Sequence, residues 1–340
     1  MSTALVAVFG AFLVSAVLTR QFCDPASRLH FLDHPNERSL HTNPTPRTGG
    51  VAINAGLLLA AVVYQAFSDD IGLLVWLSAA CLLVAVLSFV DDMKGVSVAG
   101  RFLGHTIAAG VVMAGGLILP GLELPGLAWS WPAWAGIVFT AIYLVWMINL
   151  YNFMDGMDGF AGGMAVIGFG TLALLGLLAG HQLFFMASLV VAAAACGFLL
   201  FNFPPARIFM GDTGSSVLGL LVGGFSLWGV EEQVFPFWVA ILVFSPFIVD
   251  ASVTLVRRLT RGERVWKAHK THFYQRLVQS GWGHRKTLLY EYILMVACGF
   301  SAVVSHSLSQ QWQIALLLFW VAAYPLLMAG VHLVEKKAAA

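Results

Sequence analysis

The sequence predicts an all-α fold, a polytopic bundle of membrane-spanning helices, and three observations support it. Hydrophobic residues occupy 59% of the 340 positions and charged residues only 10%, whereas soluble domains carry about 25% charged residues. Apolar runs of roughly 20 residues, the length that one membrane-crossing helix needs, recur along the whole chain. The runs are continuous and do not alternate with polar residues, which excludes a transmembrane β-barrel.

About eleven spans are expected, within a single domain that covers residues 1–340. Met1 is not followed by the basic stretch of a secretory signal, so the first apolar run is expected to remain as a span. The weakest candidate is the eighth run, because it is short and rich in glycine. The expected spans are roughly residues 2–22, 50–67, 71–90, 102–119, 134–153, 160–179, 182–201, 214–230, 235–256, 288–305 and 312–334.

The charges predict which side of the membrane each loop faces. All 18 Lys and Arg residues lie in, or at the edge of, loops that follow odd-numbered spans, and the positive-inside rule places such loops in the cytoplasm. The charged residues of the other loops are all acidic. We therefore expect a periplasmic N-terminus and a cytoplasmic C-terminus. Because the inner (cytoplasmic) loops are long and the outer ones short, we expect the functional site on the cytoplasmic face. The expected cytoplasmic loops are about residues 23–49, 91–101, 153–159, 202–213 and 257–287.

The composition and motifs also exclude several functions. A net charge of +1 gives no electrostatic support to nucleic-acid binding. The four cysteines are widely separated and lack metal-site spacing, so they are expected to be packing residues. Neither a GxxxxGK[ST] loop nor a GxGxxG fingerprint after a strand is present, so ATP hydrolysis and dinucleotide redox chemistry lack their usual phosphate cradle.

Two adjacent carboxylates, Asp91 and Asp92, follow the third run. At a membrane surface they repel each other and lose hydration unless a cation or a metal-bound phosphate compensates them. A solvated helix end is the alternative interpretation, but the helix dipole disfavours anions at a C-terminus. The pair is therefore a candidate functional site.

Polar side chains recur at every third position around the end of the fifth run, at Asn149, Asn152, Asp155 and Asp158. On a continuous helix this spacing lines one side, and such a stripe is costly against lipid. We expect it to face a ligand cavity, with a water-filled seam of the bundle as the alternative. A glycine after each aspartate allows a substrate to approach the backbone closely or the helix to break.

A third cluster, Gly211-Asp212-Thr213-Gly214-Ser215, follows the seventh run. By itself it is weak evidence, because Asp and Gly are ordinary turn residues. Together with the other clusters it places a further carboxylate, Asp212, on the same membrane face.

The loop from Arg257 to Lys286 is basic and contains His269, His272 and Arg276. Imidazole and guanidinium groups this close together are suited to binding a diphosphate. Attraction to anionic lipids is one alternative, and zinc binding is another, although a Cys or HExxH companion is missing. Anion binding is the favoured interpretation.

The first long loop adds cationic donors at Arg38, His41 and Arg47, and its prolines stiffen it. Asp250 lies inside the ninth run, about two turns from its cytoplasmic end. An acid at this depth is expected to be functional, or to pair with a residue such as Arg257. Carboxylates that hold a divalent metal opposite a basic wall are what phosphoryl transfer requires.

In combination, these motifs resemble the polyprenyl-phosphate N-acetylhexosamine-1-phosphate transferases, glycosyltransferase family 4, which includes the MraY and WecA enzymes. The resemblance covers nearly the whole chain, and the branch that looks most similar is the WbpL type, which initiates O-antigen synthesis. It rests on five motifs in this order: Pro44-Thr-Pro-Arg47-Thr-Gly-Gly50, Asp91-Asp92, Asn149-x-x-Asn152-x-x-Asp155-Gly-x-Asp158-Gly159, Gly211-Asp212-x-Gly-Ser215 and the loop with His269 and His272.

The resemblance implies transfer of an amino-sugar 1-phosphate from a UDP-sugar to undecaprenyl phosphate, with release of UMP. It implies Mg²⁺ as cofactor, with Mn²⁺ as a substitute. The donor is expected to be UDP-GlcNAc or a 6-deoxy amino sugar such as UDP-FucNAc or UDP-QuiNAc, for O-antigen or other cell-envelope polysaccharide. Expected partners are the UDP-sugar, undecaprenyl phosphate, the lipid bilayer and a second copy in a homodimer, but no nucleic acid.

The family pattern implies a role for each matching residue. The expected metal ligands are Asp212 and Asp92. The expected catalytic residues are Asp91, Asp92, Asp155, Asp158 and His272. The expected substrate-binding residues are Asn149, Asn152, Arg38, His41, Arg47, Arg101, His269 and Arg276. The histidine motif departs from the family pattern, because Lys270 and Thr271 separate the two histidines, so His269 or Arg276 is expected to share in binding the diphosphate.

The expected chemistry is a single displacement, in which a lipid phosphate oxygen attacks the β-phosphorus of the UDP-sugar. Such a monoester is mostly dianionic near neutral pH, since its second pKa is about 6, and it hardly needs a general base. A covalent aspartyl-phosphate route is the alternative mechanism. A transporter or lipid flippase that uses Asp250 is the alternative function, but the polar groups lie at one face and not at the bilayer midplane. A structural scaffold would not need so many acids at span ends.

Overall fold

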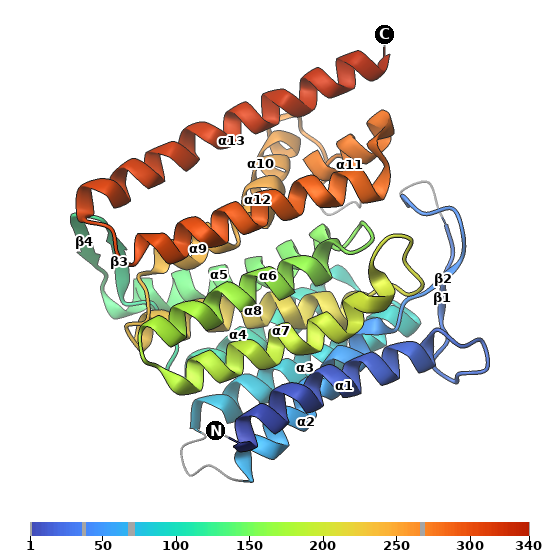
Figure 1. Ribbon diagram of the computed structural model, residues 1–340, viewed down its shortest axis with the longest axis horizontal. Coiled ribbons are helices and arrows are strands. Elements are labelled where there is room, and N and C mark those ends of the chain that lie inside the picture. The colour runs from blue at the N-terminus through green and yellow to red at the C-terminus, as the bar shows by residue number, and fades with distance from the viewer. Residues whose placement is uncertain (1, 36–38, 67–71, 266–268, 340) are drawn as a thin grey trace.

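The computed structural model describes residues 2–35, 39–66, 72–265 and 269–339, which form a bundle of long helices that run side by side (Figure 1). The helices are α1 (Ser2–Phe22), α2 (Gly49–Gln65), α3 (Gly72–Lys94), α4 (Val98–Ala114), α5 (Ala133–Met154), α6 (Phe160–Leu178), α7 (Gln182–Asn202), α8 (Asp212–Glu231), α9 (Phe237–Val243), α10 (Ser245–Thr260), α11 (Phe273–Leu277), the π-helix η1 (Val278–Trp282), α12 (Gly283–Ser305) and α13 (Gln310–Ala339).

Most of these helices are suited to cross a membrane. Within the described residues, eight stretches are long and apolar enough: α1, α3, α5, α6, α7, α8, the segment from α11 through α12, and α13. The pair α9 and α10 is a further candidate, and α2 and α4 are shorter apolar helices. The prediction of a polytopic helical membrane protein is confirmed. How many helices cross, and which end of the bundle faces the cytoplasm, stay predictions.

The structure adds strands that a purely helical fold does not contain. β1 (Leu32–Asp33) pairs antiparallel with β2 (Thr45–Pro46), and β3 (Gly121–Leu124) with β4 (Leu127–Ser130). The second pair is a hairpin whose tight turn contains Gly126 at a φ of 82°, a conformation that favours glycine. The all-α prediction is thus wrong in these two short strand pairs.

Helix α8 is buried along nearly its whole length and lies in the middle of the bundle (Figure 1). Its glycines allow neighbouring backbones to approach closely. A Cβ on Gly219 would lie 2.5 Å from the Met147 carbonyl oxygen of α5, and a Cβ on Gly214 would lie 2.7 Å from the Gly50 Cα of α2. The glycines that weaken the sequence signal of this span therefore permit its close packing.

Helices α9 and α10 meet at a bend of 83°, where the sequence analysis predicts one continuous span. Pro246 lies in the first turn of α10, a position that tolerates proline because its N–H has no helical partner. The bend brings Asp250 of α10 against the start of α11.

The described chain begins and ends at opposite ends of the bundle (Figure 1). The N-terminus shares one end with the β3–β4 hairpin. The C-terminus shares the other end with the β1–β2 pair and α11. The candidate site lies at this second end.

Candidate active site

Two neighbouring cavities contain most of the predicted site residues. We call the first, of about 220 Å³, the acidic pocket, and the second, of about 730 Å³, the apolar cavity. Among the described residues, only Asn152 and Asp212 line both. The two cavities therefore meet at these two side chains.

The acidic pocket is lined by many acidic side chains and few basic ones. Its walls carry five carboxylates, at Asp33, Asp92, Asp155, Asp158 and Asp212. Arg47 is the only Lys or Arg among its described lining residues. A diphosphate therefore requires an additional cation to enter this pocket.

The apolar cavity has a hydrocarbon-like wall and a few polar groups. Apolar side chains from α3, α4, α5 and α10 line it, among them Leu87, Phe102, Ile142, Val145 and Leu255. Its polar residues include Asp91, Arg101, His269 and His272. Such a cavity suits a molecule with a long apolar chain and an anionic head group.

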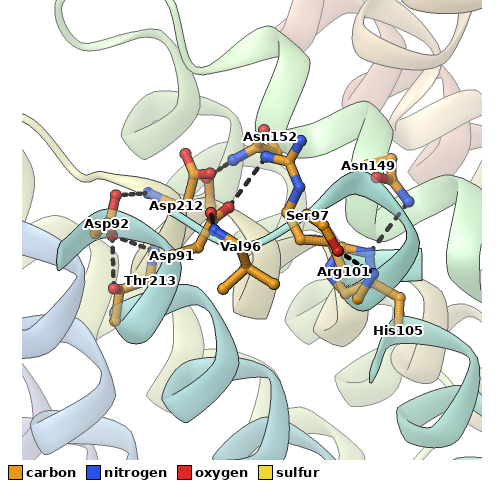
Figure 2. A network of polar contacts seen from close by, with 12 residues as sticks. Asp91, Asp92, Val96, Ser97, Arg101, His105, Asn149, Asn152, Asp212 and Thr213 are labelled. Atoms are coloured by element: carbon orange, nitrogen blue, oxygen red, sulfur yellow. Dashed lines mark hydrogen bonds and ion pairs between the residues drawn. The ribbon is translucent and has the colours of Figure 1, made fainter. Parts of the chain in front are cut away.

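Asp92 binds the first turn of α8. Its Oδ1 accepts a hydrogen bond from the Asp212 N–H at 3.3 Å, and its Oδ2 accepts hydrogen bonds from the Thr213 N–H at 3.0 Å and the Thr213 hydroxyl at 2.7 Å (Figure 2). These are N–H groups that a helix start leaves without helical partners. The Arg47 guanidinium in turn donates to the Asp92 carbonyl oxygen. Asp92 thereby fixes Asp212, while its expected role as a metal ligand stays a prediction.

Asp91 has different partners from Asp92. Its carboxylate accepts a hydrogen bond from the Val96 N–H at 2.6 Å and pairs with Arg101 at 3.0 Å (Figure 2). Asp91 lines the apolar cavity, whereas Asp92 lines the acidic pocket. The adjacent acids therefore serve two different cavities.

Asp155 follows the end of α5 and lies near two other acids. Burial, together with the neighbouring carboxylates of Asp212 and Asp92, raises the pKa of Asp155 to about 8. No described residue donates a hydrogen bond to its carboxylate. The amide of Asn152 lies beside the Asp212 carboxylate (Figure 2). Asp155 and Asp212 are thus neighbouring acids, and neither forms an ion pair with a described Lys or Arg.

The acids of this pocket fit a Mg²⁺ ion that is bound partly by substrate better than they fit a metal bound by protein ligands alone. No group of three or more His, Cys, Asp or Glu side chains in the described part of the chain is arranged to hold a metal ion. Mg²⁺ does not need one, because it keeps several waters and binds through one or two carboxylates plus substrate phosphates. Asp155 and Asp212 supply such carboxylates, whereas a structural zinc site needs four protein ligands.

Asp158 is held by residues that the sequence analysis does not single out. Its Oδ1 lies 3.0 Å from Nδ1 of His284, and its Oδ2 accepts a hydrogen bond from the Ala206 N–H at 3.0 Å. Asn202 accepts a hydrogen bond from the next residue, Gly159, at 2.9 Å. His284 and Asn202 both line the acidic pocket. Their only sequence signal is that each is a polar residue at the edge of an apolar run.

The predicted polar stripe is broken, because α5 ends at Met154. Asn149 faces α4, where its amide lies 3.3 Å from Nδ1 of His105, and it lines the apolar cavity (Figure 2). Asn152 lies at the junction of the two cavities. Asp155 and Asp158 lie beyond the helix and line the acidic pocket.

The rings of the two loop histidines are tilted by 33° with centroids 4.7 Å apart, and both line the apolar cavity. Burial, with His272 and Arg258 nearby, lowers the pKa of His269 to about 4. His269 is therefore neutral at pH 7 and offers hydrogen bonds but no positive charge. Nδ1 of His272 lies 3.2 Å from Asp250, so Asp250 pairs with the histidine loop and not with Arg257.

Three further predicted residues come from the first long loop. His41 and Arg47 line the acidic pocket and pair with Asp33 at 3.6 and 3.8 Å. The His41 ring packs against Phe209. Arg38 lies outside the described residues.

Arg276 is the predicted substrate-binding residue that the structure places away from both cavities. Its Nε donates to Glu335 of α13 at 2.6 Å, Nη2 lies 2.7 Å from Nδ1 of His332, and the guanidinium lies over the Phe273 ring. Arg276 therefore joins α11 to α13, and its expected contact with substrate has no support in this arrangement.

The fold and the two cavities define a class of protein, a polytopic membrane protein that can bring a polar anionic ligand next to an apolar one. The sequence profile of Glycosyl transferase family 4 matches residues 73–230, which include the acids from Asp91 to Asp212. The chain belongs to glycosyl transferase family 4.

Relatives with assigned names match most of the chain. A probable undecaprenyl-phosphate N-acetylglucosaminyl 1-phosphate transferase of Bacillus subtilis is 30% identical over 311 residues, 89% of this chain and 86% of the relative. A decaprenyl-phosphate N-acetylglucosaminephosphotransferase of Mycobacterium tuberculosis is 30% identical over 328 residues, 86% of this chain and 81% of the relative. A phospho-N-acetylmuramoyl-pentapeptide-transferase of Staphylococcus carnosus is 25% identical over 309 residues, 85% of this chain and 95% of the relative.

Proposed function

We propose that this protein transfers an N-acetylhexosamine 1-phosphate from a UDP-sugar to undecaprenyl phosphate and releases UMP. The observation that carries the proposal is the junction of the acidic pocket with the apolar cavity at Asn152 and Asp212. A reaction between a water-soluble diphosphate and a lipid phosphate needs two such sites side by side, so that the reacting atoms are held in contact.

The apolar cavity is the proposed site of the lipid acceptor. Its apolar wall suits the first isoprene units, and Arg101 and His272 are the groups that would bind the phosphate. Arg101 is already paired with Asp91 at 3.0 Å, so Asp91 orients the guanidinium in this proposal. Asp91 is then a positioning residue and not an obligatory base.

The acidic pocket is the proposed site of the UDP-sugar diphosphate. Asp212 and Asp155 would hold Mg²⁺ there, with Mn²⁺ as a substitute. Bound Mg²⁺ would neutralise phosphate oxygens and stabilise the charge that develops on departing UMP. Arg47, held by Asp33 and the Asp92 carbonyl oxygen, offers the pocket's positive side chain. Asp158 and His284 would position the nucleotide.

The proposed chemistry is a single displacement. A phosphate oxygen of the lipid forms a bond to the β-phosphorus of the donor, while the bond from that phosphorus to the oxygen bridging to the α-phosphate breaks. UMP leaves with the electron pair of that bond. Because the lipid phosphate is mostly dianionic near neutral pH, the residues at the junction orient and desolvate it and need not remove a proton.

GlcNAc 1-phosphate is the favoured group, because the relatives in Bacillus and Mycobacterium carry that sugar in their names. FucNAc and QuiNAc remain donors to compare, and the proposed biological role is the first step of O-antigen or other cell-envelope polysaccharide synthesis. We place the site at the cytoplasmic face of the inner membrane, where the basic loops are expected. The pairing of Asp250 with His272 removes the unpaired acid that motivated the transporter alternative.

The direct test is UMP release by purified protein with Mg²⁺, undecaprenyl phosphate and a panel of UDP-sugars. Asp212→Asn and Asp155→Asn are each expected to lower the rate by on the order of 100-fold. Asp24→Asn is the matched control, since this exposed carboxylate accepts a hydrogen bond from the Ala26 N–H nearby and lines neither cavity. Absence of UMP release with every donor, from a folded protein, would overturn the proposal.

A further inference from the structure

Asp250 is a buried carboxylate with an unusual number of hydrogen-bond donors around it. Its Oδ1 lies 3.2 Å from Nδ1 of His272, 3.0 Å from the Phe273 N–H and 3.1 Å from the Thr254 hydroxyl. Its Oδ2 accepts a hydrogen bond from the Tyr274 N–H at 3.2 Å. Asp250 thus binds the first turn of α11 and the imidazole that precedes it.

These contacts favour one of the two neutral tautomers of His272. Both carboxylate oxygens of Asp250 accept hydrogen bonds from backbone N–H groups, so the carboxyl group acts as an acceptor here. The 3.2 Å contact between Oδ1 and Nδ1 of His272 fits an Nδ1–H donor. Nε2 has no hydrogen-bond partner among the described residues, and the ring lines the apolar cavity.

We propose that Asp250 is a positioning residue that acts through His272. It holds the Nδ1–H and so leaves Nε2 as the nitrogen that faces the phosphate of the acceptor lipid. The inference rests on the proposed function, because it assigns His272 to the lipid phosphate of that same site. A carboxylate that sets the tautomer and orientation of an imidazole is a recurrent arrangement in functional sites.

The position of Asp250 agrees with this assignment. Asp250 lies on α10, one turn before Thr254 and just after the bend from α9, and its side chain is only 10% exposed. His272 is also buried, with 4% of its side chain exposed. Both groups are shielded from solvent, and the His272 ring is held between the Asp250 carboxylate and the rings of His269 and Tyr274.

Steady-state kinetics of UMP release test the proposal. Asp250→Ala is expected to lower kcat by on the order of 10- to 100-fold, with KM for the UDP-sugar unchanged. Asp250→Asn, which keeps one acceptor oxygen, is expected to retain more of kcat. Thr254→Val is the matched control: it removes one donor from the same carboxylate without touching the imidazole, and kcat is expected to stay within about 2-fold.

The discriminating experiment is the double mutant. If Asp250 acts through His272, Asp250→Ala has no further effect on kcat in a His272→Gln background. If Asp250 only stabilises the loop, the same fold-loss recurs in both backgrounds, and the proposal is overturned. Wild-type protein that releases no UMP contradicts the proposed function instead.

A measurement on the wild-type protein does not depend on the variants folding. Nitrogen-15 NMR of labelled histidine, at a pH where the ring is neutral, reports which nitrogen bears the proton. We expect the Nδ1–H tautomer for His272, assigned by its loss in His272→Gln. An Nε2–H tautomer would overturn the inference even if catalysis proceeds as proposed.

Discussion

The Oδ1 atom of Asp158 lies 3.0 Å from Nδ1 of His284, although 126 positions separate the two residues. The contact joins the loop after α5 to the first turn of α12, and both residues line the acidic pocket. His284 therefore orients a carboxylate that the proposed function assigns to nucleotide binding.

His284→Ala is expected to raise KM for the UDP-sugar by roughly 10-fold, because Asp158 loses the partner that orients it. KM for undecaprenyl phosphate should stay unchanged, since His284 does not line the apolar cavity. Initial rates measured against each substrate in turn separate these two effects. His306→Ala, which removes an exposed histidine at the opposite end of α12, is the control; an equal KM change in both variants contradicts the prediction.

Asp155 makes the metal-free protein sensitive to pH. Burial and the nearby acids raise the pKa of Asp155 to about 8, above the ordinary value of about 4 in an unfolded chain. Between these values the folded protein binds more protons than the unfolded one, so stability falls as the pH rises. In chelator, we expect the melting temperature to fall less between about pH 5 and pH 8 for Asp155→Asn than for wild type. Identical pH profiles would contradict this.

Asp92 and Asp212 are expected to respond differently to magnesium. Asp92→Ala removes hydrogen bonds at the start of α8 and should lower the free energy of unfolding by about 1–2 kcal/mol, with a modest shift in the Mg²⁺ concentration for half-maximal rate. Asp212→Asn should shift that concentration strongly with little loss of stability. Activity titrations with Mg²⁺ and melting curves distinguish the two. A stronger shift for Asp92→Ala would favour Asp92 as the principal ligand.

Gly156 lies where a side chain does not fit. A Cβ there would lie 2.3 Å from the Tyr274 hydroxyl and 3.2 Å from Nε2 of Gln275. Gly156→Ala should therefore lower the free energy of unfolding by about 1–3 kcal/mol and reduce UMP release. Gly170→Ala is the matched control in α6, where nothing lies within 4 Å of the added carbon. There, alanine should leave stability equal or improve it by up to about 1 kcal/mol.

Arg276 tests the assignment of the basic loop. Because its guanidinium binds Glu335 and packs on Phe273, Arg276→Ala should lower the melting temperature and leave KM for the UDP-sugar unchanged. Arg264→Ala removes an exposed arginine of the same loop and should change neither. A raised KM with an unchanged melting temperature would restore Arg276 to the substrate site.

The helices could be predicted because each long apolar run in the sequence is about as long as one membrane-crossing helix. The bend between α9 and α10 could not, since the run around Pro246 is continuous and the direction of the chain depends on what it packs against. The short strands were not predicted either. The pairing of β3 with β4 depends on the turn at Gly126, which a hydrophobic pattern does not record.

Most residues of the candidate site could be predicted from the sequence, but their partners in space could not. Adjacent acids at a span end marked Asp91 and Asp92, but only their partners in space show that the two serve different cavities. His284 could not be predicted as a site residue, because a histidine at the edge of an apolar run does not indicate a function until its carboxylate partner is known. The local cluster of basic residues predicted a substrate contact for Arg276, but it could not predict the Glu335 partner, which lies 59 positions away. The substrate contact stays a prediction.

Because Asn152 and Asp212 line both cavities, they form the boundary between them. A single inhibitor with a charged nucleotide-like group at one end and an alkyl tail at the other would have to cross that boundary to occupy both sites. The side chain at position 152 is therefore the first place to look for resistance to such a compound.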